Sequence, residues 1–425
     1  MLEANISPTQ NRVVPNAQPS KPYFVPGRLN PAQFAAIRST LVLNSCKWDP
    51  QLEDVSTLAD FPIVLEKEHW RKLSQWAESL SHETFCAEEE IIRRPCLLSA
   101  LGMPRKLRAV LSEGRGVAAS KAAVRALRFD FHFTTEGWKL SEVNSDVPGG
   151  FCEASAYTQL MARHFAQSRP AGDPAALWAS AVAEVSGFGT VALLSAPGFM
   201  EDHQVIAYLA SCLRKQGCRT HLANPTQIHW QRGNATLHTT WSQAPADALV
   251  RFFQAEWMPR MLKDCSWKGY FVGGVTPLAN PGIAAISESK RMPLVWSDLD
   301  CPMSTWRALL PETRDPREVR WRKDDTWILK SAYSNTGDTV CIRELMAARE
   351  WKQVQREMWF SSGGWVAQRR FDPIPIETPI GELYPCLGVY TVNGKTAGIY
   401  GRLGFRPLID FSAIDVAVLL EEETA

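Results

Sequence analysis

Two short segments, Arg128-Phe129-Asp130 and Glu142-Val143-Asn144, carry side chains of the types that could form a metal and anion site. Residues i and i+2 of a β-strand share a face, so each group projects its polar side chains to one side. A three-residue turn over Thr135-Glu136-Gly137, with glycine in the left-handed position, would set Asp130 opposite Glu142 and Arg128 opposite Asn144. A four-residue turn would shift the register by one and move Glu142 to the other face.

In the favoured register the two carboxylates lie roughly 5 Å apart and repel each other. Arg128 offsets part of this repulsion, and Mg²⁺, which binds carboxylate and amide oxygens, would offset the rest. The alternative is a surface hairpin whose polar face is solvated. Gly149 and Gly150 follow the hairpin and allow backbone to approach a ligand closely, which favours a site over a plain turn.

The elements that must position these residues follow from periodicity. Residues 127–133 and 138–144 alternate between apolar and polar, which predicts two paired strands. Helical spacing predicts helices over about 66–81, 87–98, from 104 onward, and 342–359. Strand and helix patterns alternate from about 187 to 298, with a helix expected over 282–290, which indicates a small doubly wound unit. Further strands are expected at 327–330, 365–368, and in a hairpin across Asn393-Gly394.

Composition excludes several classes of protein. The 425 residues are 45% apolar and 21% charged, and the net charge of +1 argues against a nucleic-acid binder or a polybasic membrane binder. The ten cysteines have no zinc-ligand spacing and fit buried, reduced thiols. No signal peptide and no run of ~20 apolar residues is evident, so we expect a cytoplasmic protein. Residues 1–30 have the composition of an extended arm.

Several short segments, in order along the chain, resemble the ATP-grasp synthetase domain of the glutathionylspermidine synthase family. The hairpin segments Leu127–Asp130 and Lys139–Pro148 match its R-F-D and E-x-N-x-D-x-P motifs. Further similar segments are 98–104, 153–154, 252–258, 280–296, 327–330, 364–368, 384–385 and 393–402. The resemblance covers roughly residues 60–415 and leaves no length for the amidase domain of that family.

The resemblance implies an α/β (α+β) fold of the ATP-grasp type, with circularly permuted order and an inserted doubly wound subdomain. Residues 31–186 would form a helical region and the first part of the ATP-grasp domain. Residues 187–300 would form the inserted substrate subdomain, and residues 301–425 the lid and C-terminal part.

The resemblance also implies an activity. Such enzymes transfer the γ-phosphoryl group of ATP to a carboxylate, and an amine then attacks the acyl phosphate with ADP as a product. The substrates would be a small peptide or amino-acid carboxylate and an amine. The implied roles are as follows: carboxylate and oxyanion binding by Arg128 and Arg402; ATP binding by Lys330, Gly337 and Gln368; Mg²⁺ binding by Asp130, Glu142 and Asn144; and substrate binding by Asp146, Gly149, Gly150 and Glu256.

Three departures from the family keep other hypotheses open. Thr336 replaces an acidic residue, so Asp338 must substitute for it; Gly149-Gly150 replace a Thr-Ser pair; and no acidic residue follows Arg402. The second hypothesis is a degenerate ATP-grasp protein that binds nucleotide or a small molecule without catalysis. A third treats residues 187–298 as a small-molecule binding module and the rest as scaffold. The sequence sets neither the substrates nor the oligomeric state.

Overall fold

The computed structural model describes residues 21–52, 55–113, 123–261, 265–333 and 340–422. Most of the predicted N-terminal arm lies outside these residues, and so do the predicted ATP-binding Gly337 and its neighbours Thr336 and Asp338. The described part of the arm is extended: Tyr23 and Phe24 form a short strand, and Tyr23 is buried.

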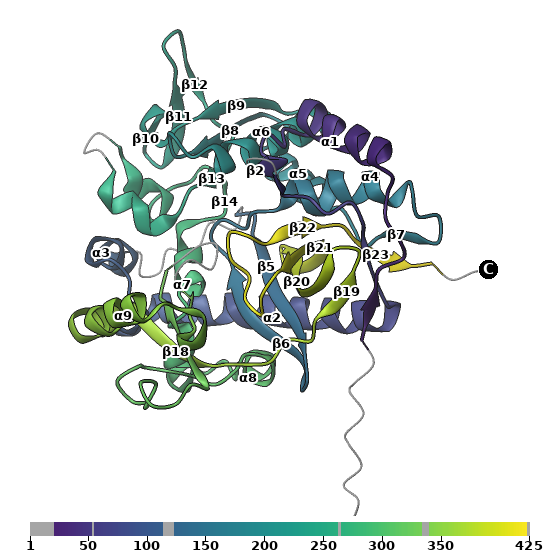
Figure 1. Cartoon of the computed structure of the whole chain (residues 1–425). Coiled ribbons are helices and arrows are strands. Elements are labelled where there is room, and N and C mark those ends of the chain that lie inside the picture. The colour runs from purple at the N-terminus through teal and green to yellow at the C-terminus, as the bar shows by residue number, and fades with distance from the viewer. Residues whose placement is uncertain (1–20, 53–54, 114–122, 262–264, 334–339, 423–425) are drawn as a thin grey trace, which may run out of the picture.

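A six-stranded antiparallel sheet occupies the centre of the molecule (Figure 1). Its order is β22-β21-β20-β5-β6, and β19 pairs with β20. The strands are β5 (Ala126–Thr134), β6 (Gly137–Asn144), β19 (Ile376–Thr378), β20 (Gly381–Val392), β21 (Lys395–Gly404) and β22 (Ile414–Val416). The predicted hairpin across Asn393-Gly394 is confirmed, with φ of 49° and 80° at its two turn residues, as the mirror-image turns favoured in hairpins require.

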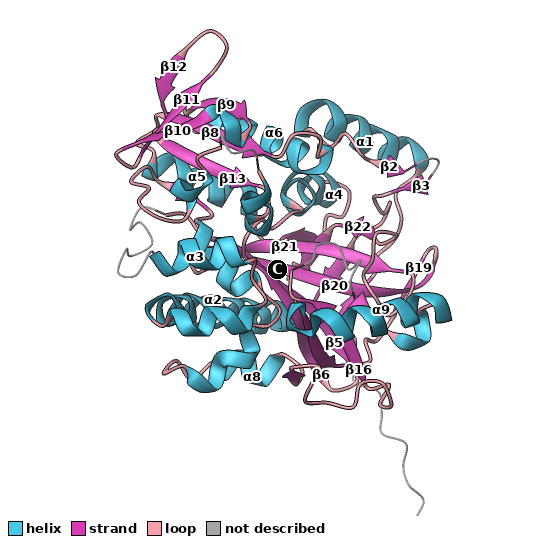
Figure 2. Cartoon of the chain, turned by 90° about the vertical axis from the view of Figure 1, so that its left-hand side faces the viewer, coloured by secondary structure: helices cyan, strands magenta, loops and turns pink. Residues whose placement is uncertain are grey.

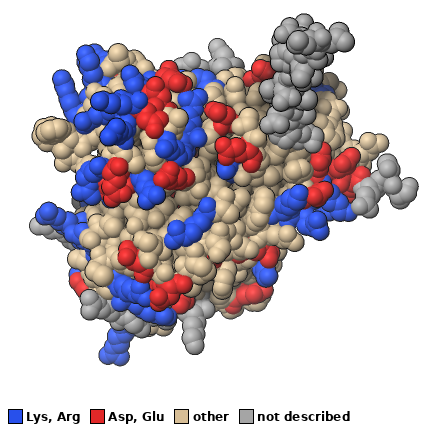
Figure 3. Space-filling model, turned by 90° about the horizontal axis from the view of Figure 1, so that it is seen from below, with Lys and Arg blue, Asp and Glu red and all other residues tan. Residues whose placement is uncertain are grey.

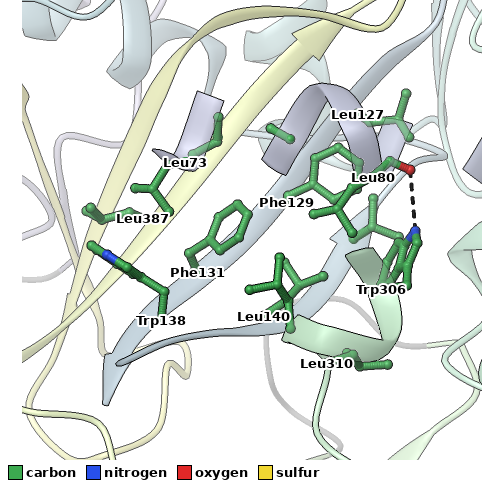
Figure 4. Packing of buried hydrophobic residues seen from close by; sticks show 14 of the residues in the cluster. Leu73, Leu80, Leu127, Phe129, Phe131, Trp138, Leu140, Trp306, Leu310 and Leu387 are labelled. Atoms are coloured by element: carbon green, nitrogen blue, oxygen red, sulfur yellow. Dashed lines mark hydrogen bonds between the residues drawn. The ribbon is translucent and has the colours of Figure 1, made fainter. Parts of the chain in front are cut away.

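One face of the central sheet is apolar and packs against helix α2 (Lys67–Arg93). Phe129 and Phe131 of β5 belong to the same buried cluster as Leu80 of α2 (Figure 4). Trp306, also in this cluster, donates its indole N–H to the Leu80 carbonyl at 3.3 Å. The prediction of two separate helices at 66–81 and 87–98 is wrong, because α2 is one continuous helix over these segments as far as Arg93. Its buried stripe continues through Thr84, Ala87 and Ile91, and Pro95 then begins a 3₁₀ helix.

A second sheet of order β15-β18-β16-β17 lies against the other, polar face of the hairpin. Its strands are β15 (Thr313–Arg314), β16 (Trp327–Ser331), β17 (Val340–Cys341) and β18 (Trp365–Arg369). Helix α9 (Ala348–Ser361) packs on it through Trp351, Val354 and Met358. The predicted helix from 342 begins only at Ala348, because residues 343–345 form a 3₁₀ turn.

A parallel sheet of order β14-β13-β8-β9 forms the α/β unit predicted for residues 187–298. Its strands are β8 (Thr190–Ser195), β9 (Arg219–Ala223), β13 (Ala248–Phe252) and β14 (Leu278–Ala279). The helix predicted over 282–290 is a 3₁₀ turn followed by the single turn α7 (Ala285–Glu288). At the end of this turn, the Glu288 carboxylate accepts from backbone N–H groups of the loop after β6.

Further strands and helices complete the fold (Figure 2). The further strands are β1 (Tyr23–Phe24), β2 (Gln51–Leu52), β3 (Val55–Ser56), β4 (Ile63–Leu65), β7 (Ser168–Pro170), β10 (Ile228–Gln231), β11 (Asn234–His238), β12 (Gln243–Pro245) and β23 (Val418–Glu421). The further helices are α1 (Pro31–Ser45), α3 (Arg105–Glu113), α4 (Thr158–Ala162), α5 (Pro174–Val185), α6 (Met200–Lys215) and α8 (Ser304–Leu309).

The surface and the thiols agree with the composition. Basic and acidic side chains are interspersed on the face seen in Figure 3. All ten cysteines are free thiols, as predicted. Among the described residues, none of the helices is long and apolar enough to span a bilayer.

Candidate functional site

The hairpin β5–β6 places Asp130 opposite Glu142 and Arg128 opposite Asn144, the predicted register. The turn is not the predicted one: Thr134 pairs with Gly137, so only two residues form the loop. A bulge between Asp130 and Phe131 restores the register, because it inserts one extra residue into β6. Without the bulge, Glu142 would lie on the apolar face.

The extra residue, Ser141, is used twice. Its hydroxyl donates to the Asp130 carbonyl at 3.0 Å, and its own carbonyl accepts from Lys330 Nζ at 3.1 Å. Lys330 lies on β16 of the second sheet, so this hydrogen bond joins the two sheets. Burial lowers the pKa of Lys330 to about 8.

Asp130 is the centre of a buried charge cluster. Arg128 donates to both of its oxygens, with Nε–Oδ1 at 2.8 Å and Nη2–Oδ2 at 3.1 Å. Arg402, from β21, donates to Oδ2 at 2.9 Å, and the Asn144 amide donates to Oδ2 at 3.2 Å. Burial alone would raise the pKa of Asp130, but the two arginines outweigh it and hold that pKa below its usual value. The side chain is 1% exposed.

Backbone shape makes room for this cluster. A Cβ at Gly388 would lie 2.7 Å from Arg128 Cδ and 2.9 Å from Asp130 Oδ1, so only glycine fits beside the ion pair. Arg128 also donates to the Gly149 carbonyl at 2.6 Å. Gly150 has φ of +92° and lies against the Tyr400 ring, where a Cβ would come within 2.8 Å of a ring carbon.

Glu142 faces a different set of charges. Lys290, in the segment after α7, lies 3.3 Å from its carboxylate. Burial raises the pKa of Glu142, but Lys290 and Lys330 lower it more, so the carboxylate is held ionised. The Glu142 side chain is 24% exposed, which leaves it accessible to a ligand.

Two pockets meet at Ser141, Glu142 and Lys330. The arginine pocket adds Asp130 and Arg402, with an aliphatic wall formed by Ile328, Val340, Ile342, Pro407, Leu408 and Ile409. The glutamine pocket adds Lys290 and Gln368, with an apolar wall formed by Met292, Pro293, Trp296, Trp306 and Leu310. Together they form one cleft between the two sheets, with Glu142 and Lys330 at the junction of the pockets and Asp130 and Arg402 at the arginine end.

Gln368, on β18, is buried and half satisfied. Its amide N–H donates to Thr313 Oγ1 at 3.1 Å, whereas its Oε1 accepts no hydrogen bond from the described residues. A buried acceptor without a partner is costly. An orphaned acceptor beside apolar walls fits the edge of a flat heterocycle that carries an amino group.

The donor set of the hairpin suits Mg²⁺. Two carboxylates and an amide supply hard oxygen ligands, and one or two carboxylates commonly suffice when phosphates and water complete the shell. No group of three or more His, Cys, Asp and Glu side chains with metal-ligand geometry occurs among the described residues. Asp130 could bind a metal only by releasing Arg402 or Asn144, whereas Glu142 is more open.

Asp146 and Glu256, two of the predicted substrate-binding residues, line neither pocket. Asp146 is almost fully buried, and its carboxylate accepts from Arg251 and from the Ala255 N–H at 2.7 Å. It ties the hairpin to the α/β unit. Glu256 has an Oε2 without a partner among the described residues, and burial, with Asp146 nearby, raises the pKa of Glu256 to about 8.

Sequence reasoning missed Lys290, Gly388 and Tyr400 as members of the site. Lys290 pairs with Glu142 across 148 residues, and Gly388 reaches Arg128 only through the β20–β5 pairing. Alternation along β20 and β21 was the available signal, since Gly388 and Tyr400 share a face with Asp130 and Arg402.

Comparisons with known proteins agree on the family and the fold. A family model described as "Glutathionylspermidine synthase preATP-grasp" matches residues 53–414. The structure is similar to that of a glutathione synthetase-like effector from Globodera pallida, with 14% identity, a TM-score of 0.60, and coverage of 85% of this chain and 90% of that one.

Two further solved structures are more distant. A putative γ-glutamylcysteine synthetase from Methylobacillus flagellatus has 11% identity, a TM-score of 0.39, and coverage of 77% and 83% of the two chains. A D-alanyl-alanine synthetase A from Vibrio cholerae has 13% identity, a TM-score of 0.32, and coverage of 51% and 68%. None of the curated proteins matches the sequence.

Proposed function

The chain belongs to the glutathionylspermidine synthase preATP-grasp family, and from this premise we propose that it is an ATP- and Mg²⁺-dependent ligase. It joins a small peptide or amino-acid carboxylate to an amine and forms ADP. The observation that carries the proposal is the cleft between the two sheets. In it Lys330, Glu142 and Asp130 surround one space and Arg402 lies beside them.

The nucleotide would lie across the cleft. The orphaned Gln368 Oε1 would accept from the adenine amino group. The free volume of the glutamine pocket is about 30 Å³, so its apolar walls would have to move apart to admit the base. Lys330 would contact the phosphates as a compact cation. Glu142, Asn144 and Asp130 would hold Mg²⁺, which neutralises phosphate charge when it is bound. Gly337 is proposed to contact the phosphates from the loop after β16.

The carboxylate substrate would take Arg402 and Arg128 as partners. Guanidinium groups match planar oxygen pairs and remain charged throughout. A carboxylate oxygen attacks the γ-phosphorus, the bond to the β-phosphate oxygen breaks, and ADP leaves. The amine nitrogen then attacks the acyl carbon, the oxyanion forms beside the arginines, and inorganic phosphate leaves as the amine loses its proton.

We also infer the finer architecture and the substrate contacts. The α/β unit is inserted into an ATP-grasp fold whose elements follow a circularly permuted order. The backbone at Gly149 and Gly150 and the carboxylates of Asp146 and Glu256 are proposed to bind or shape the substrate side. The full pairing of Asp146 favours a shaping role for it.

One observation favours the second candidate, a nucleotide binder without catalysis. Both oxygens of Asp130 are engaged by arginines, so the metal site is self-neutralised. The two candidates separate on turnover, since both predict nucleotide binding.

The test is ADP formation by the purified, Mg²⁺-loaded protein with pooled carboxylates and amines, followed by mass spectrometry of the products. We expect ADP that requires both a carboxylate and an amine, and its loss in Arg402→Gln. Arg93→Gln is the matched control, because Arg93 pairs with Glu89 at the exposed surface of α2 and lines neither pocket. Nucleotide binding with no ADP above background would favour the second candidate.

A further inference from the structure

Tyr400 touches both arginines of the site and belongs to none of the roles above. It lies on β21, two residues before Arg402, and its side chain is on the same sheet face. Its ring centroid is 5.1 Å from Arg128 Cζ and 5.6 Å from Arg402 Cζ. One aromatic ring therefore contacts the two guanidinium groups that also share Asp130.

The ring is fixed from both ends. Its hydroxyl donates to Asp415 Oδ1 at 2.5 Å, and its ring lies against the Gly150 backbone, where a Cβ would meet three of its carbons within 2.9 Å. Asp415 is also the cross-strand partner of Arg402 in the β21–β22 ladder. The hydroxyl bond thus anchors the ring to the strand beside Arg402.

Asp415 is itself held by a cation from the N-terminal part of the chain. Lys47 is 6% exposed and lies 3.5 Å from Asp415, 2.5 Å from Glu153 and 2.9 Å from Asp49. Lys47 precedes the residues matched by the family, and Asp415 directly follows them. The contacts run from Lys47 through Asp415 and Tyr400 to the two arginines.

The arginines need such a support if they exchange partners. In this structure Asp130 neutralises and orients both guanidinium groups. A metal at Asp130 and a carboxylate substrate at Arg402 would each compete for these contacts. The two like charges would then repel, and the face of an aromatic ring is a partner that neither ligand displaces.

We propose that Tyr400 is the positioning residue that holds Arg128 and Arg402 in their reactive orientation, and that Lys47 and Asp415 hold Tyr400. The proposal rests on the proposed function for the role of the arginines. The contacts themselves do not depend on it.

The first test observes the arginines directly. Nε–Hε resonances of Arg128 and Arg402 are assigned by nuclear magnetic resonance from their disappearance in Arg128→Lys and Arg402→Lys. Because both guanidinium groups lie over the ring, we expect upfield positions that move downfield in Tyr400→Leu. Phe253→Leu is the control, since it removes a fully buried ring from the α/β unit. Unmoved resonances in Tyr400→Leu would overturn the proposal, whether or not the protein is a ligase.

A second set of variants covers the case in which Tyr400→Leu does not fold. Tyr400→Phe and Asp415→Asn keep the ring but remove its anchor, and we expect smaller movements of the same two resonances. Tyr157→Phe is the control, because it removes a buried hydroxyl that bonds the Ala59 carbonyl. Equal spectra for Tyr400→Phe and Tyr157→Phe at these two resonances would overturn the anchoring step.

The kinetic readout separates positioning from packing. Once a carboxylate and an amine are known, Tyr400→Phe, which loses the hydroxyl bond to the Asp415 carboxylate, should lower kcat/KM for the carboxylate by roughly tenfold while leaving KM for ATP within twofold. A purely structural role would lower the thermal midpoint and leave this ratio unchanged. Failure to find any ligase reaction would count against the proposed function, and the spectra would still decide the role of Tyr400.

Discussion

The two ends of the cleft differ in how far their polar groups are already paired. At the arginine end, Asp130 accepts hydrogen bonds from three side chains on its two oxygens. At the glutamine end, Gln368 has an acceptor that is buried and unused. The buried carboxylate at the arginine end is therefore fully hydrogen-bonded without a ligand, whereas the buried amide oxygen at the glutamine end is not.

This difference separates two kinds of preorganisation. Binding of a base at Gln368 would satisfy a costly orphan without breaking any hydrogen bond of its Oε1. Binding of a metal or a carboxylate at Asp130 and Arg402 must replace contacts that already neutralise each other. We therefore expect ATP to bind before these contacts change. The reaction would follow once a metal and a carboxylate replace the contacts between Asp130 and Arg402.

The largest expected effect is on stability, at the paired end. Asp130→Asn removes the charge that compensates two buried guanidinium groups, so we expect a loss of about 3–5 kcal/mol in the free energy of unfolding. Chemical denaturation would measure it. Glu142→Gln is the comparison, because Glu142 is more exposed, and we expect a clearly smaller loss. Equal losses would remove the distinction between the two carboxylates.

The next effect is on nucleotide binding in the middle of the cleft. Lys330→Met removes a cation that would donate to phosphate oxygens, so we expect affinity for Mg²⁺·ATP to fall roughly 10–100-fold. Isothermal titration calorimetry would measure it. Lys352→Met, at an exposed lysine of α9 that lines neither pocket, should bind as the unaltered protein does. An unchanged affinity in Lys330→Met would place the phosphates elsewhere.

The pH dependence of ATP binding follows from the same lysine. Burial lowers the pKa of Lys330 to about 8 in the free protein, and bound phosphate favours the charged form. Affinity for ATP is therefore full below this pKa and should fall by up to about tenfold per pH unit above pH 8. Lys330→Arg keeps its charge in this range and should flatten the profile. A profile equally steep in Lys330→Arg would assign the dependence to another group.

The smallest effect tests the unpaired end. Gln368→Leu removes an acceptor without a partner and one hydrogen bond to Thr313, so we expect little change in the free energy of unfolding, about 1 kcal/mol or less. ATP affinity should fall by roughly fivefold for the lost hydrogen bond to the base. Thr313→Val controls for the bond between the two side chains. A large loss of stability with unchanged ATP affinity would make Gln368 a structural residue.

The features predicted correctly from the sequence are the ones that depend on short-range patterns of residues. Alternation in residues 127–133 and the Asn393-Gly394 turn determine the strands, and the register at Asp130 was predicted correctly although the turn was not. That success depended on the bulge at Ser141, which compensates for the shorter turn. Residue type and spacing do not predict a bulge of this kind. Ser141 is stabilised there by hydrogen bonds to Asp130 and to Lys330, which is 189 residues away in the sequence.

Long-range pairings could not be predicted in the same way. Lys290 lies in a segment that reads as helix, and its contact with Glu142 arises because that helix stops after one turn. At the end of that turn the Glu288 carboxylate accepts from the N–H groups of Ser145 and Asp146, contacts that local sequence does not reveal. In α2 the error is the opposite one, because two helices were predicted where there is one. The polar residues between the two predicted helices are part of a continuous helix whose buried stripe is unbroken.

The most direct test of the central claim is a crystal structure of the protein with Mg²⁺ and a non-hydrolysable ATP analogue. We predict the base beside Gln368, the phosphates at Lys330, and the metal at Glu142 with Asn144 or Asp130. An analogue bound outside the cleft between the two sheets, or no binding at saturating concentration, would contradict the account.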